Sequence, residues 1–72
     1  MLKKHQWWRM DEDKAELIVN AIGVAVMELI GERVPITRDN LVNKLEHNRR
    51  ETGNVIGKGA NRDAAELVRK GK

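Results

Sequence analysis

Apolar residues are densest between Ala15 and Ile30, where the sequence AELIVNAIGVAVMELI holds twelve apolar residues in sixteen positions. With successive residues placed about 100° apart, most of these side chains share one wide face and the polar residues lie opposite. The pattern predicts an amphipathic helix over about residues 11–31, with Asp11 as its cap and Gly31 as its stop signal. Its many β-branched residues keep a pair of buried strands open as the alternative, but the length of the run and its period favour the helix.

A second apolar stripe lies outside the main face of this helix. Leu17 and Val24 are seven residues apart on it, with Met27 nearby and Ala21 between them. A helix in a three-helix monomer rarely needs two apolar stripes. Either the chain's own N-terminal segment or third helix covers this stripe, or the stripe is a face for a homodimer or another protein. The candidate partner face is Leu17, Ala21, Val24 and Met27.

The connection after the first helix leads into a clear start signal for a second helix. Thr37 is a good N-cap, and Ile36 and Leu41 have the spacing of a hydrophobic staple around it. Apolar residues then recur on one narrow stripe, which predicts a helix over about residues 37–52, although the pattern also allows an end near Glu46.

The last element has an apolar face that includes Ala64. Counted backward, the same face extends to Ile56, so the helix spans either residues 54–70 or residues 60–70. The longer form accepts a cost of about 1 kcal/mol for each interior glycine. Together the three segments predict an all-α, three-helix domain over residues 11–72.

Residues 1–10, MLKKHQWWRM, are basic and show no regular period, so we expect a flexible basic tail. If the tail is ordered, Trp7 or Trp8 packs on the second stripe of the first helix. The sharper alternative is a contact with nucleic acid or an anionic membrane, in which a tryptophan stacks or inserts. The basic residues that would meet the phosphates are Lys3, Lys4 and Arg9.

Composition narrows the class of protein. The chain has 72 residues, a formal net charge of +3 and no cysteine, so we expect one small domain with no disulfide and no thiolate metal site. A chain of this size is marginally stable alone, which leaves oligomerisation or very close helix packing as support. The apolar block is too short and too often interrupted to span a membrane, and no signal peptide is evident, so we expect a cytoplasmic protein.

Residues with catalytic or metal-binding potential are sparse. Serine and cysteine are absent, the two histidines lie 42 residues apart, and capping explains the acidic residues at the start of the first helix. The glycine-rich segment GNVIGKG at residues 53–59 lacks the spacing and the Ser or Thr of a phosphate-binding loop. The sequence therefore predicts no catalytic, cofactor-binding or metal-binding residue, and it points away from an enzyme.

Five basic residues in the C-terminal half form a candidate patch: Lys44, Arg49, Arg50, Lys58 and Arg62. The plainer interpretation is that cations at the end of the second helix interact favourably with the helix dipole. The functional interpretation is weak binding of nucleic acid. If the third helix begins at Asn54, the last two helices also fit a helix-turn-helix. The residues presented by its reader helix would be Asn54, Lys58, Asn61, Arg62 and Arg69.

Two segments resemble small enterobacterial helical proteins. The run AIGVAVMEL at residues 21–29, with the proline-containing connection after it, resembles the fumarase D-like family. The run VPITRDNLVNKLE at residues 34–46 resembles the biofilm and acid-resistance regulator family of small helical dimers. The first resemblance implies a hydratase, and the second implies a homodimer that acts on regulatory partners or DNA. The segments KKHQWW and GKG match neither family.

From the sequence we expect a small regulatory or protein-interaction module that forms a homodimer and has no catalysis of its own. The partner is expected to be a second copy of the chain or another protein, and no cofactor is expected. The alternatives are a weak nucleic-acid-binding regulator that uses the basic patch and a fumarase-like hydratase.

Overall fold

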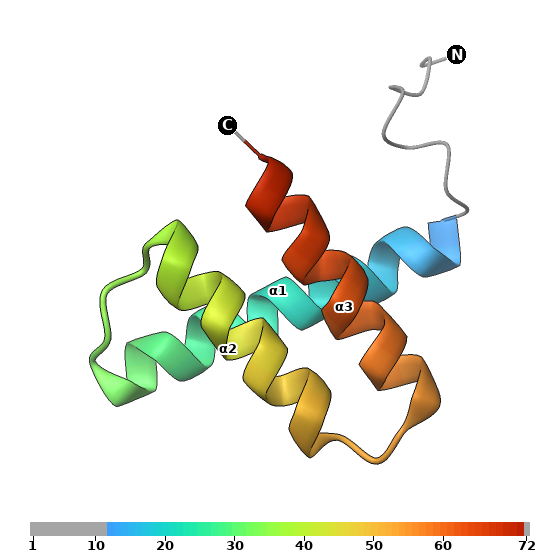
Figure 1. Cartoon of the computed structure of the whole chain (residues 1–72), viewed down its shortest axis with the longest axis horizontal. Helices are drawn as coiled ribbons and strands as arrows, with labels where there is room; N and C mark the ends of the chain where they lie inside the picture. Colours follow the sequence, from blue (N-terminus) through green and yellow to red (C-terminus); the bar gives the residue numbers. More distant parts are fainter. Residues whose placement is uncertain (1–11, 72) are drawn as a thin grey trace.

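The computed structural model describes residues 12–71. They form three helices, α1 (Glu12–Glu32), α2 (Arg38–Glu51) and α3 (Val55–Lys70), and this part of the chain contains no strand. The helices α2 and α3 run in opposite directions as a hairpin, and the hairpin lies across one side of α1 (Figure 1). The all-α, three-helix prediction is confirmed, in the form in which the third helix begins early.

The helix α1 ends one residue later than its glycine stop signal predicts. Gly31 stays inside the helix, and Arg33 takes the left-handed conformation at φ 60°. The backbone amide of Arg33 donates to the carbonyl of Ile30 at 3.1 Å, and that of Val34 donates to the carbonyl of Leu29 at 2.9 Å. This is a Schellman motif, in which the left-handed position is usually a glycine because a Cβ there costs free energy.

The start of α2 is the one that the sequence predicts. The side-chain oxygen of Thr37 accepts a hydrogen bond from the backbone amide of Asn40 at 3.1 Å, so Thr37 is the N-cap. The Asn40 side chain also donates to the carbonyl of Pro35 at 2.9 Å, which fixes the approach of the chain. The helix runs past Glu46 to Glu51, where the amide of Thr52 closes the last turn on Asn48.

Asn54 caps α3 and thereby fixes its early start. Its side-chain oxygen accepts from the amides of Ile56 at 2.8 Å and Gly57 at 3.3 Å. A Cβ at Gly57 would lie 3.1 Å from the Thr52 hydroxyl oxygen, so this glycine lets the first turn of α3 pack against the short connection. Asn61 lies inside the helix, and its side chain donates to the carbonyl of Gly57 at 2.9 Å.

Small side chains dominate the core, where the three helices meet. Leu45 of α2 is the largest fully buried side chain among the described residues. Five of the seven residues in the core cluster are alanines. Alanine lets helices approach closely, but it removes little apolar surface from water and so contributes little stability per residue. The members of the cluster are Ile18, Ala21, Ala25, Leu45, Ala60, Ala64 and Ala65.

Candidate functional sites

Large apolar side chains lie exposed along α1, beside its buried face. Val19 is 60% exposed and Ile30 is 59% exposed, although the sequence places both at the flank of the core face. Val26 is half-buried between them, and Gly23 is exposed. These four residues recur at spacings of four, three and four, so they share one face of the helix. We call Val19, Gly23, Val26 and Ile30 the outer strip.

The structure divides the candidate partner face that the sequence indicates. Leu17 and Val24 are about as exposed as each other, at 41% and 44%, and form one wall of a groove of about 460 Å³. Ile56 of α3 also lines this groove, as does Ala21, which is only 8% exposed and belongs to the core. Met27 is exposed but does not line the groove. The predicted contact of Trp7 or Trp8 with this stripe lies outside the described residues.

The outer strip is the site that reasoning from the sequence missed. The helical period places Val19 and Ile30 beside the buried face of α1, and the hairpin covers a narrower sector of α1 than its apolar residues occupy. One signal was available in the sequence, the glycine inside the helical pattern at Gly23. In the structure, a Cβ at this position would have no described atom within 4 Å apart from its chain neighbours and the backbone of its own helix. An unexplained glycine inside a helix points to close approach by something outside the chain.

Four of the five predicted basic residues converge on the hairpin. Arg49 and Arg50 from the last turn of α2 face Lys58 and Arg62 of α3 across a hollow of about 510 Å³, which Val55 and Gly59 also line. We call this site the basic hollow, and its lining comes from α2 and α3 alone. The fifth residue, Lys44, lies elsewhere.

Lys44 is occupied by an ion pair between α1 and α2. Its Nζ lies 2.7 Å from a carboxylate oxygen of Glu32, at the C-terminal end of α1. One turn further along α2, Asn48 donates to a carboxylate oxygen of Glu28 at 2.7 Å. These two contacts fasten α2 to α1, so Lys44 is a structural cation here and does not belong to the basic hollow.

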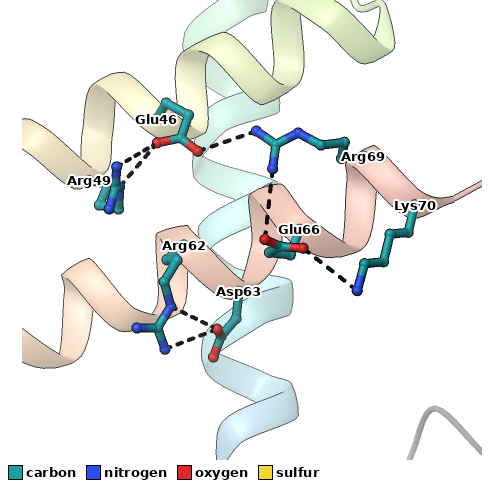
Figure 2. Close-up of polar contacts among 7 residues, drawn as sticks. All are labelled: Glu46, Arg49, Arg62, Asp63, Glu66, Arg69 and Lys70. Carbon is teal, nitrogen blue, oxygen red and sulfur yellow. Dashed lines mark hydrogen bonds and ion pairs between the residues drawn. The ribbon is translucent and has the colours of Figure 1, made fainter.

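Carboxylates neutralise part of the charge around the basic hollow. Glu46 lies between Arg49 and Arg69 and pairs with them at 3.0 Å and 3.4 Å (Figure 2). Asp63 pairs with Arg62 at 3.2 Å. Such exposed pairs contribute roughly 0–1 kcal/mol each. Their larger consequence is that they engage some of the cations and leave the others free to bind a ligand.

The two remaining cations of the basic hollow have no carboxylate partner among residues 12–71. Lys58 donates from its Nζ to the backbone carbonyl of Arg49 at 3.1 Å, which holds the ammonium group at the mouth of the hairpin turn. Arg50 makes no ion pair or side-chain hydrogen bond within the described chain. The uncompensated positive charge of the hairpin therefore lies at Arg50 and Lys58.

The helix-turn-helix prediction meets its spacing requirement, because three residues separate α2 from α3. The side chains of the predicted reader are nevertheless engaged within the fold. Asn54 caps α3, Asn61 bonds to the carbonyl of Gly57, and Arg69 pairs with Glu46. Lys58 and Arg62 are the two predicted reader residues that line the basic hollow.

The described residues hold no group of three or more His, Cys, Asp or Glu side chains that could bind a metal ion. None of the helices between residues 12 and 70 is long and apolar enough to cross a membrane. Comparison of the chain with models of protein families, with curated proteins and with solved structures finds no match. The resemblances to the fumarase D-like and regulator families therefore stay predictions.

Proposed function

We propose that this chain is a small regulatory protein-interaction module that associates with a second copy of itself through the outer strip of α1. The observation that carries the proposal is the distribution of apolar side chains. Alanines fill most of the core, while Val19, Met27 and Ile30 of α1 are each more than half exposed. Association buries the large side chains that folding leaves in water.

The size of the chain supports this proposal. A domain of 72 residues without cysteine has no disulfide to stabilise it, and a core of this kind supplies only a few kcal/mol of stability. Burial of apolar surface contributes about 25 cal/mol per Å² removed from water. A dimer that covers the outer strip therefore gains free energy from burying apolar side chains that contribute little to the stability of the monomer.

The positions of the outer strip favour an antiparallel pair of α1 helices. With the twofold axis between residues 24 and 25, Val19 meets Ile30 of the second copy, and Gly23 meets Val26 of the second copy. Each large side chain then faces a complementary one, and the glycine leaves room for the valine. In a parallel pair, by contrast, Gly23 would face Gly23 and leave a void.

Charges at the two ends of the strip fit the same register. Glu16 and Arg33 lie equally far from the proposed axis, so each meets the other across an antiparallel pair. Both are exposed, and neither makes an ion pair within residues 12–71. Arg33 also occupies a left-handed position that normally favours glycine. An intermolecular ion pair with Glu16 would offset part of the free-energy cost of the left-handed backbone at Arg33.

The proposed role needs no catalytic group in the chain itself. The module acts by presenting a surface, in the cytoplasm, and its dimer offers two copies of the α2–α3 hairpin to further partners. The fumarase-like hydratase stays the lower alternative, because no observation on the described residues favours it.

Sedimentation velocity tests the proposal with a matched pair of variants on α1. The wild type is expected to shift from monomer to dimer as its concentration rises. Val19→Glu places a charge within the interface, opposite Ile30 of the second copy, and is expected to stay monomeric, with the helical circular dichroism of the wild type. Leu17→Glu, on the groove side of the same helix, is expected to dimerise like the wild type. A wild type that stays monomeric, or equal loss in both variants, would refute the outer strip as the interface.

A further inference from the structure

We propose that the basic hollow binds the phosphomonoester group of a small phosphorylated molecule. The hollow lies where the last turn of α2 meets the first turns of α3, and its volume is about 510 Å³. Sites for small molecules commonly enclose about 300–1,000 Å³. The hollow shares no residue with the outer strip, so the inference is independent of the proposed dimer.

The charge of the hollow matches one phosphate group. Four cations line it, and two carboxylates, Glu46 and Asp63, pair with two of them. Glu46 is also shared with Arg69, and Asp63 with Lys14. The two cations without a carboxylate partner, Arg50 and Lys58, give the hollow a charge of +2. A phosphomonoester carries a charge of about −1.5 to −2 near neutral pH.

The two uncompensated cations are suited to hold a phosphate between them. Arg50 offers a planar guanidinium whose paired N–H groups fit two phosphate oxygens at once. Lys58 uses one donor on the carbonyl of Arg49, at 3.1 Å, and keeps two donors for a ligand. One cation comes from each helix of the hairpin, and the ends of the two helix dipoles oppose each other here. The side chains therefore carry the attraction.

Gly59 supplies the second observation. A glycine inside a helix lowers helix stability relative to alanine, so its presence needs a reason. Packing explains Gly57, whose Cβ would crowd Thr52, but a Cβ at Gly59 would have no described atom within 4 Å apart from its chain neighbours and the backbone of its own helix. Gly59 lines the basic hollow. Its missing side chain keeps the floor of the hollow open to a ligand.

The distribution of the other cations favours a small phosphorylated molecule over a nucleic-acid backbone. A backbone would need an extended row of free cations. On the same helices, Lys44, Arg69 and Lys70 are each paired with a carboxylate, at 2.7 Å, 3.4 Å and 3.7 Å. Arg38 begins α2, at the opposite end from the hollow. The free charge is thus local to the hairpin turn.

Isothermal titration calorimetry of the full chain tests the inference with three probes: inorganic phosphate, glucose 6-phosphate and glucose. We expect saturable binding of both phosphates and none of glucose. Binding of inorganic phosphate alone would assign the site to the free anion and overturn the phosphomonoester. Arg50→Gln and Lys58→Gln are each expected to weaken binding about tenfold, the effect of losing one charge-assisted contact. Lys44→Gln is the matched control, with unchanged binding.

Gly59→Ala separates a binding role from a structural one. If the glycine serves the hollow, alanine raises the melting temperature and weakens phosphate binding. Unchanged phosphate binding in Gly59→Ala, Arg50→Gln and Lys58→Gln would refute the site. Fluorescence anisotropy with a labelled DNA duplex completes the test. Tighter binding of the duplex than of glucose 6-phosphate, with a steep loss as salt rises, would overturn the small-molecule ligand in favour of nucleic acid.

Discussion

The inner face of the α2–α3 hairpin and the outer strip of α1 use apolar residues in opposite ways. The hairpin closes on Leu45, which is 0% exposed, and on alanines that allow the helices close approach. On α1, Val19 and Ile30 remain mostly in water. The inner face of the hairpin therefore completes its packing within one chain, whereas the outer strip of α1 does not. This difference separates what stabilises the fold from what we expect to bind a partner.

Leu45→Ala should have the largest effect, because it removes the largest fully buried side chain and leaves a cavity between three helices. We expect a loss of about 3 kcal/mol in the free energy of unfolding. Urea unfolding at a low and a high protein concentration should show the same loss. Val19→Ala is the control on the outer strip and should lose stability only at the high concentration. Equal losses in the two variants at both concentrations would erase the distinction between the two faces.

The sequence predicts best the features that depend on residues close together in the chain. The caps Thr37 and Asn54 act on amides within three residues, so local spacing reveals Thr37 as a cap and residue 54 as one of two possible starts of the third helix. The convergence of Arg49 and Lys58 follows from the short turn between their helices. Position in the hairpin alone could not show which cations stay free.

Contacts between distant segments limit what the sequence can show. Lys44 and Glu32 are twelve residues apart in the chain, and their pairing depends on how α2 crosses α1. The exposure of Val19 and Ile30 depends on how much of α1 the hairpin covers. A helical wheel gives the angle of each side chain but not the width of the covered sector.

Gly23→Ala sharpens the comparison because its two expected effects have opposite signs. In the monomer, alanine improves helix propensity by about 0.5–1 kcal/mol, and the added Cβ has no described atom within 4 Å apart from its chain neighbours and the backbone of its own helix. In the dimer, the same methyl group crowds Val26 of the second copy. We expect a higher melting temperature at low concentration and a weaker dimer by sedimentation. A stronger dimer would place Gly23 outside the interface.

Glu46→Gln should have the smallest effect on stability and should report on the charged side of the hairpin. It removes the carboxylate shared by Arg49 and Arg69 (Figure 2), whose side chains are about half exposed to solvent. The expected loss is about 0.5 kcal/mol after allowance for solvent screening. The variant also frees Arg49 beside the basic hollow, so phosphate should bind more tightly. Weaker phosphate binding would contradict the charge count proposed for the hollow.

Thiol cross-linking tests the central claim most directly, because the wild-type chain contains no cysteine. Two variants, Val19→Cys and Ile30→Cys, are treated with a short bifunctional thiol reagent, separately and as an equimolar mixture. An antiparallel dimer on the outer strip predicts covalent dimers in the mixture and few in either variant alone. Efficient cross-linking of Val19→Cys to itself, or no cross-linking in the mixture, would contradict the account.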